Sequence, residues 1–203
     1  MEKPKRARKR KLETSQGGPE ATDHDFFGGQ GVYQPHPVRQ VQIPKAGKPG
    51  ELRTLGIPTI YDRVCQQALL NRLEPVFEPV FDDANFGYRR GRSTKDALRK
   101  VWKEIQEEER EWIVDADLKD FFGSVDHKKL LTLVAQRVAD GRVLRLIRAM
   151  LKAGSYGKGR LFPNERGTPQ GGVVSPLLSN ILLTPFDREM RHSQGISAHE
   201  VCG

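Results

Sequence analysis

Three aspartates lie close together in residues 112–122, a stretch that begins with apolar side chains and ends with two phenylalanines. The pattern predicts a strand over 112–118 with Asp115 and Asp117 on one face and Asp120 in the turn that follows. A carboxylate at the end of a buried strand is costly unless it meets a cation, and Mg²⁺ prefers oxygen ligands. We therefore expect Asp117 to bind Mg²⁺ and to be catalytic in phosphoryl transfer. The alternative is an acidic strand end that faces solvent.

A second group of residues suits a nucleotide. Phe122 follows Asp117 by five positions, where a ring can pack under the sugar of a nucleoside triphosphate and exclude a 2′-hydroxyl, although a core aromatic is a serious alternative. In the Gly-rich turn 167–172, Gly171 allows close backbone approach and Gln170 offers a donor and an acceptor. Alone, such a turn is more often a simple connector. Together the two groups indicate a nucleic-acid polymerase, yet two-metal transfer usually draws carboxylates from two segments and the sequence offers one.

Basic side chains form the third group. Guanidinium groups match phosphate geometry, so five arginines are candidates for triphosphate or template phosphates, although most surface arginines have no such role: Arg53, Arg63, Arg89, Arg90 and Arg92. Lys45 and Lys48 lie in a basic loop and are expected to contact nucleic acid. The adjacent pair Asp82 and Asp83 has no apolar hairpin around it, which favours a capping or turn role over metal binding.

Hydrophobic periodicity predicts the elements of the first half of the chain. A hairpin is expected over 38–43 and 52–57, on either side of the basic loop. A helix follows from Pro58 and is interrupted by Pro75 and Pro79. A second helix begins at Ser93 or Thr94 and is expected to bury a stripe at helical spacing, made of Ala97, Leu98, Val101, Trp102 and Ile105.

The second half alternates again between strands and helices. The strand at 112–118 precedes two helices at 126–139 and 141–153, a short ribbon at 155–162, and a last helix that opens at Ser175 or Pro176. No internal repeat is present. This mixed order of elements predicts an α+β fold.

Composition adds a basic tail to this picture. The 203 residues carry a formal charge of +8, but residues 3–11 hold seven of the basic groups, and outside residues 2–11 there are 27 basic and 25 acidic side chains. The charge therefore indicates a polyanion-binding arm better than a uniformly basic domain. The two cysteines lack metal-ligand or disulfide spacing. With no membrane-span or signal-peptide pattern, we expect a cytoplasmic protein.

Several blocks, in order, resemble the reverse transcriptases encoded by bacterial group II introns. Residues 43–45 with 53–59 and 62–69 resemble the first fingers motif, and 86–93 resemble the second. Residues 117–122, with Val125-Asp126-His127, resemble the first catalytic palm motif, and 167–180 resemble the nucleotide-facing palm motif. The resemblance spans about residues 36–192, and the ordered set is far more specific than any single motif. Retron and diversity-generating transcriptases share the palm residues and remain alternatives.

The resemblance implies a right-hand polymerase with fingers and an incomplete palm. It divides the chain into a disordered basic tail (1–36), fingers (37–111), a partial palm (112–192) and a tail outside the family pattern (193–203). Mg²⁺ would be bound by the side chain of Asp117 and the carbonyl of Leu118. Phe122 would select the sugar, Gln170 and Gly171 would face the incoming nucleotide, and Arg53 and Arg63 would contact its triphosphate. The implied partners are RNA template, DNA primer, intron RNA and deoxynucleoside triphosphates, with the oligomeric state left open.

The chain departs from the family after residue 192. The family continues with an apolar hairpin that carries Tyr-Ala-Asp-Asp, whereas residues 193–203 hold no aspartate and no strand-like run. We therefore expect a fragment of an RNA-directed DNA polymerase that is inactive alone, because ligands that act as a unit cannot be removed singly without gross loss. Two other interpretations stay open: a non-catalytic basic RNA-binding protein, and a decaying coding remnant that folds poorly.

Overall fold

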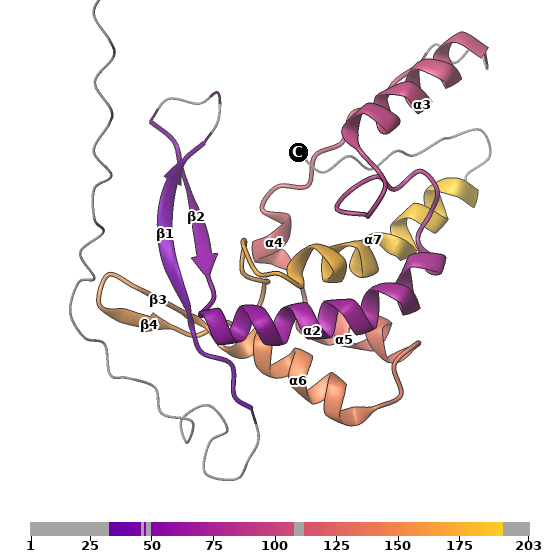
Figure 1. Ribbon diagram of the computed structural model, residues 1–203. Helices are drawn as coiled ribbons and strands as arrows, with labels where there is room; N and C mark the ends of the chain where they lie inside the picture. The colour runs from indigo at the N-terminus through magenta and orange to yellow at the C-terminus, as the bar shows by residue number, and fades with distance from the viewer. Residues whose placement is uncertain (1–32, 46, 48–49, 108–111, 193–203) are drawn as a thin grey trace, which may run out of the picture. The chain divides into compact units, whose positions relative to one another are not determined.

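The structure is a computed structural model that describes residues 33–45, 47, 50–107 and 112–192 (Figure 1). The chain divides into two units, Met1–Gln34 and Pro35–Gly203, and the description below concerns the second unit. Almost all of the predicted basic tail, together with Lys48 and the 193–203 tail, lies outside the described residues.

The second unit combines one small sheet with a set of packed helices (Figure 1). Its elements in chain order are β1 (Val38–Pro44), β2 (Leu52–Ile57), α2 (Ile60–Phe77), a 3-10 turn (Glu78–Val80), α3 (Thr94–Glu107), α4 (Phe121–Ser124), α5 (His127–Ala135), α6 (Gly141–Lys152), β3 (Ser155–Gly157), β4 (Arg160–Phe162) and α7 (Ser175–His192). The predicted hairpin, the paired helices, the ribbon and the last helix are thereby confirmed.

The sheet joins the N-terminal hairpin to the ribbon at residues 155–162, in the order β2-β1-β3-β4. β1 pairs antiparallel with β2 and parallel with β3, which in turn pairs antiparallel with β4. The register places Val38 opposite Ser155 and Gly56 opposite Gln40. Side chains of paired residues share a face, so one face of the sheet carries Val38, Gln40 and Ser155 together.

The core lies among four helices. α5 packs against α6 and α7, and α7 also contacts α2. Each helix contributes an apolar stripe that is almost wholly removed from water, and its members include Leu69, Leu73, Phe77, Leu130, Val134, Ile147, Leu151, Leu178 and Ile181. Full burial of one such side chain contributes about 1.5–3 kcal/mol. Among the described helices, none is long and apolar enough to cross a bilayer.

Proline 75 does not end its helix, contrary to prediction. α2 runs through Pro75 to Phe77, and it begins at Ile60 behind the N-cap Thr59, whose hydroxyl accepts from the Asp62 amide at 3.1 Å. A proline removes one hydrogen bond and crowds one carbonyl. Here the buried side chains of Leu73 and Phe77, on either side of it, hold the last turn against the core.

The buried stripe predicted for α3 is mostly wrong. Ala97 is fully buried, but Leu98 and Trp102 are 64% and 66% exposed. Periodicity records that a helix is amphipathic and leaves open whether another element covers the apolar side. In the described residues, α3 offers an apolar face that little of the chain covers.

The central strand predicted at 112–118 is also wrong. These residues form no regular structure, and Trp112 and Val114 are 90% and 91% exposed. A strand needs a neighbour for its amides and carbonyls, and the four described strands pair only with one another. Apolar residues without a neighbouring strand therefore remain in water, and the alternative of a solvent-facing acidic segment describes this part of the chain.

Candidate active site

The Gly-rich turn is fixed on one side by the segment that contains α4. The Gly167 amide donates to the Val125 carbonyl and the Thr168 amide to the Phe122 carbonyl, both at 2.8 Å. Gly167 has a φ of +87°, and a Cβ there would lie 2.8 Å from the Phe122 carbonyl oxygen and 3.0 Å from that of Gly123. Only glycine combines this left-handed backbone with so close an approach. The segment 117–127 and the Gly-rich turn are thus joined backbone to backbone.

Two side chains converge on the carbonyl of Gly167. The His127 Nε2 lies 2.6 Å from this oxygen and the Asn164 Nδ2 donates to it at 3.1 Å. Because a carbonyl only accepts, the His127 Nε2 carries the proton. His127 is 8% exposed, and its Nδ1 is buried without a hydrogen-bond partner among the described residues. Asn164 also donates to the Leu151 carbonyl at 2.8 Å, which ties the turn to the end of α6.

The other side of the turn is fixed by the hairpin and by α2. The Gly56 amide donates to the Gln170 carbonyl at 2.7 Å. Gly171, with φ of +106°, passes so close to β2 that a Cβ would lie 2.9 Å from the Gly56 carbonyl oxygen. The Val173 amide donates to the Gln66 side chain at 2.7 Å. The turn therefore connects β2, α2 and the α4–α5 segment, which are far apart in the sequence.

A cavity of about 180 Å³ lies between α2 and α7, but the larger one, of about 620 Å³, lies beside the turn. Four of the residues predicted for nucleotide or nucleic acid line this larger cavity: Lys45, Arg53, Phe122 and Gln170. The shared sheet face of Val38, Gln40 and Ser155 forms another part of its wall. Its volume falls within the range of small-molecule sites, so it can accept a ligand of nucleotide size.

The cavity is basic, and two of its cations were not predicted. Lys119 and Arg166 line it together with Arg53 and Lys45. Lys45 is paired with Glu51 at 2.8 Å, whereas the other three have no ion pair within the described part of the chain. The sequence gives only a weak signal for either residue. Lys119 lies between Asp117 and Asp120, and Arg166 directly precedes the turn. Uncompensated guanidinium and ammonium groups suit a phosphate-bearing ligand.

The carboxylates predicted to bind metal are not gathered at this cavity. Asp117 and Leu118 are exposed and absent from its lining, while Asp120 lines it with an unusual φ of +50°. Among the described residues, no group of three His, Cys, Asp or Glu side chains is placed to hold a metal. The residues present therefore do not fit a complete Mg²⁺ site, and no catalytic step can be derived through the metal here.

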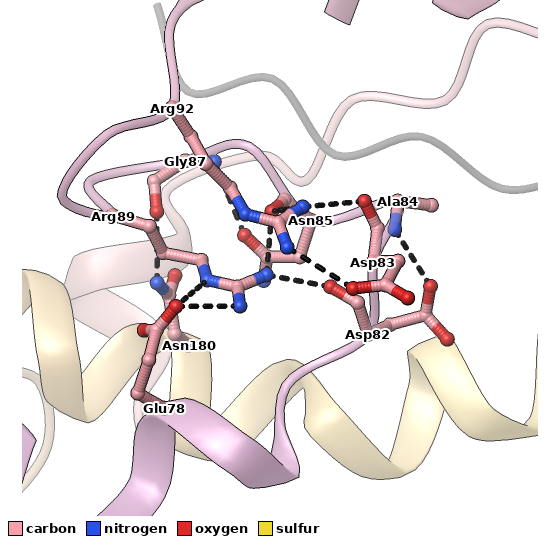
Figure 2. A network of polar contacts seen from close by, with 9 residues as sticks. All are labelled: Glu78, Asp82, Asp83, Ala84, Asn85, Gly87, Arg89, Arg92 and Asn180. Carbon is pink, nitrogen blue, oxygen red and sulfur yellow. Dashed lines mark hydrogen bonds and ion pairs between the residues drawn. The ribbon is translucent and has the colours of Figure 1, made fainter. Parts of the chain in front are cut away.

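Arg89 is committed to the protein rather than to solvent. Its guanidinium donates to Glu78 at 2.6 and 3.0 Å and to the carbonyls of Asp82 and Asn85 at 2.6 and 2.8 Å (Figure 2). The side chain is buried, as is expected for an arginine with this many acceptors. These contacts favour a structural role for Arg89 over the predicted contact with nucleic acid.

The other arginines predicted to bind phosphate in this half of the chain differ in their surroundings. Arg92 donates to the Asp83 carbonyl at 2.6 Å and its carboxylate at 3.1 Å, and this hydrogen bond lowers the pKa of Asp83 (Figure 2). The predicted turn role is confirmed for Asp82, whose carboxylate accepts from the Ala84 amide at 2.8 Å, whereas Asp83 is paired with Arg92. Arg90 is exposed and lies 3.3 Å from Glu74, and Arg63 is exposed on α2, outside the cavity lining.

The loop that contains Asp82, Asn85 and Gly87 is also held by α7. The buried Asn180 donates to the Gly87 carbonyl at 2.8 Å (Figure 2). Asp187, further along the helix, is buried and its Oδ2 has no hydrogen-bond partner among the described residues. Burial raises the pKa of Asp187, an Asn85 side-chain hydrogen bond opposes this, and the nearby Asp82 charge adds to it. Ionisation of Asp187 therefore costs free energy in the folded protein.

Comparisons with known proteins agree with this architecture. Residues 43–200 match the model of the family described as reverse transcriptase (RNA-dependent DNA polymerase). The chain is 41% identical over 161 residues to the protein YkfC of Escherichia coli K12, and 39% identical over 158 residues to the group II intron-encoded protein LtrA of Lactococcus lactis. Each alignment covers 78% of this chain, but 42% and 26% of the two relatives, so the chain spans less than half of their length.

A solved structure shares the fold. The partial Cas6-RT-Cas1–Cas2 complex matches 81% of this chain and 28% of its own with a TM-score of 0.52 and 26% identity. The chain therefore belongs to the reverse transcriptase family. The resemblance to group II intron-encoded reverse transcriptases and the α+β fold class of a reverse transcriptase are both confirmed.

Proposed function

We propose that this chain provides the fingers (37–111) and part of the palm (112–192) of a group II intron-type RNA-directed DNA polymerase. The observation that carries the proposal is the cavity beside the Gly-rich turn. It brings together Phe122 from the first palm motif, Gln170 from the second and Arg53 from the fingers hairpin. The parent reaction is the addition of a deoxynucleotide to a primer 3′ end on an RNA template.

Each cavity residue has a role that its chemistry allows. Phe122 packs under the deoxyribose, and Gln170 faces the nucleotide at the turn. Gly171 is outside the cavity lining and would act through its backbone, which passes close to β2. Arg53, with Lys119 and Arg166, offers positive charge to the triphosphate. Arg63 is a weaker candidate, because it is exposed on α2 and outside the lining.

In this proposal, the side chain of Asp117 and the carbonyl of Leu118 would bind Mg²⁺. The described residues supply one carboxylate segment, and two-metal transfer usually draws on two. We therefore propose that the chain alone binds nucleotide without polymerising it, and that a hairpin carrying the family's Tyr-Ala-Asp-Asp segment completes the site.

The first test is primer extension on an RNA template with Mg²⁺, with the purified chain beside its Asp117→Ala variant. Neither protein should make product alone, and adding the hairpin segment in trans or in a repaired reading frame should give product that needs Asp117. A repaired chain that still makes no DNA would refute the polymerase proposal. Product from the unrepaired chain, lost in the variant, would show that other residues supply the second metal site.

A second candidate function follows from the exposure of Asp117. In that case the chain is a non-catalytic RNA-binding protein. RNA binding that falls with added salt and survives Asp117→Ala, without nucleotide binding in the cavity, would favour it.

A further inference from the structure

The positive charge of the chain is concentrated in two places. One is the basic run at residues 3–11, and the other is the segment 141–164, which holds six basic side chains and no acidic one. The rest of the chain, outside residues 2–11 and this segment, holds 21 basic and 25 acidic side chains. Residues 141–164, called the basic segment below, contain α6, β3 and β4.

Within α6 the basic residues share one face. They recur every three or four residues, all are exposed, and along the helix they span about 15 Å: Arg142, Arg145, Arg148 and Lys152. The opposite face is buried, with Ile147 and Leu151 in the core. Apart from Gly141 at its start, the exposed residues of α6 are therefore all cationic.

Few of these cations are neutralised. Arg142 is paired with the N-cap Asp140 at 3.0 Å, while Arg145, Arg148 and Lys152 have no ion pair in the described part of the chain. The exposed face of α3 is different, because Arg99 pairs with Asp96 at 3.1 Å and Lys103 lies 3.5 Å from Glu107. A solvated surface helix usually mixes both signs, as α3 does. The basic face of α6 lacks this compensation.

The basic segment is continuous with the candidate active site. Asn164 bonds both the Leu151 carbonyl at the end of α6 and the Gly167 carbonyl of the turn. Ser155 of β3 lines the nucleotide cavity. Beyond it, the ribbon adds Arg160 and Phe162, both exposed, and Phe162 is paired in register with Ser155. A strand that leaves the cavity across this ribbon reaches phosphate-binding side chains and an aromatic ring.

We propose that the basic segment is a second nucleic-acid-binding surface, which contacts the phosphates of an RNA strand outside the nucleotide cavity. The proposal rests on the proposed function, since a polymerase fragment must hold a strand beyond its reacting end. Guanidinium groups suit phosphate, and phosphate contacts carry no direct sequence information, so the binding is independent of sequence. A membrane is a poorer fit, because the apolar face of α6 is buried in the core and cannot insert into lipid.

The test compares two triple variants of the full chain that remove the same charge. One is Arg145→Gln, Arg148→Gln, Lys152→Gln on α6, and the control is Lys95→Gln, Arg99→Gln, Lys103→Gln on the exposed face of α3. Binding of a fluorescent 20-nucleotide RNA without secondary structure is measured by anisotropy over a range of salt concentrations. The α6 variant should bind about tenfold or more weakly and lose about 2 units of the log–log salt slope, at roughly 0.7 per lost contact with a single strand.

The control variant should change affinity by less than about twofold. Equal losses in both variants, or no loss in either, would overturn the proposal, because net charge or the basic tail would then explain binding. Loss of binding to phosphatidylserine vesicles without loss of RNA binding would assign the surface to lipid instead. Binding of a fluorescent deoxynucleoside triphosphate separates this proposal from the proposed polymerase function. The α6 variant should still bind the nucleotide. Gln170→Ala should abolish nucleotide binding without affecting RNA binding.

Discussion

The Gly-rich turn and the acidic segment 112–118 carry the two strongest motifs of the sequence, yet the structure treats them in opposite ways. The turn is fixed by backbone hydrogen bonds to β2 and to the α4 segment and by the buried donor His127. The acidic segment has no regular structure, and its apolar residues are in water. The hydrogen-bond partners of the turn lie between Gly56 and Ser175, inside the described chain, whereas a strand at 112–118 needs neighbours that the described residues do not provide. The turn is therefore fixed by contacts that the described chain supplies, and the acidic segment lacks such contacts.

Substitution of Gly167 should have the largest effect on this contrast. Gly167→Ala should cost about 3 kcal/mol or more in the free energy of unfolding, because a left-handed φ alone costs about 1–2 kcal/mol for a non-glycine residue and the carbonyls of Phe122 and Gly123 must also move. Thermal denaturation followed by circular dichroism measures it. The matched control is Gly159→Ala, which has a φ of +74° with open space around it. Equal losses for both variants would mean that the close contact is unimportant.

His127 offers the next largest effect. His127→Leu removes one of two side-chain donors to the Gly167 carbonyl and should cost about 1–2 kcal/mol in stability, with a several-fold weaker affinity for a fluorescent deoxynucleoside triphosphate. His127→Gln should retain most of both, because its amide nitrogen can reach the position of the Nε2. If the leucine variant binds nucleotide normally after allowance for unfolded protein, His127 holds the core and does not position the turn.

Asp187, which lies on α7 beside Asn85 and Asp82 and away from the turn, tests whether a buried polar group is always stabilising. Its folded-state pKa is raised by burial, so its contribution to stability is greatest below the unfolded value of 3.8 and is lost as the pH rises through the folded pKa. Asp187→Asn should therefore raise the melting temperature at pH 7 by about 2–4 °C, which corresponds to roughly 1 kcal/mol in a chain of this size. The gain should vanish near pH 3. An unchanged or lower melting temperature at pH 7 would show that the carboxylate has a stabilising partner.

The sequence predicted most of the elements, because hydrophobic periodicity and turn residues are local signals. The resemblance also assigned Phe122, Gln170 and Arg53, which come from separate motifs, to one nucleotide site, and all three line the same cavity. Prediction from the sequence failed where the outcome depends on a distant partner. Leu98 belongs to an amphipathic helix pattern and Val114 to a strand-like pattern. Nothing in the neighbouring sequence shows whether another element covers these side chains.

The polar residues were harder still. Arg89 is the same residue type in the same motif as Arg90, yet one is buried among carbonyls and the other is exposed. His127 stabilises a carbonyl 40 positions away, which neither propensity nor spacing can indicate. Lys119 and Arg166 give no local signal, because a single basic residue beside a motif resembles any surface charge until the fold brings it to the cavity.

The smallest effect on stability is expected from a substitution in the acidic segment 112–118, the counterpart of the turn. Val114→Thr should change the free energy of unfolding by less than about 0.5 kcal/mol, because the side chain is already in water. In a chain that also carries the family's hairpin, the same substitution should cost more than about 1 kcal/mol, since Val114 would then be buried between strands. Amide hydrogen exchange over 112–118 provides the local readout: it should be fast in the present chain and protected when the hairpin is supplied. Slow exchange in the present chain would mean that the segment is already paired, and the contrast between the turn and the acidic segment would not hold.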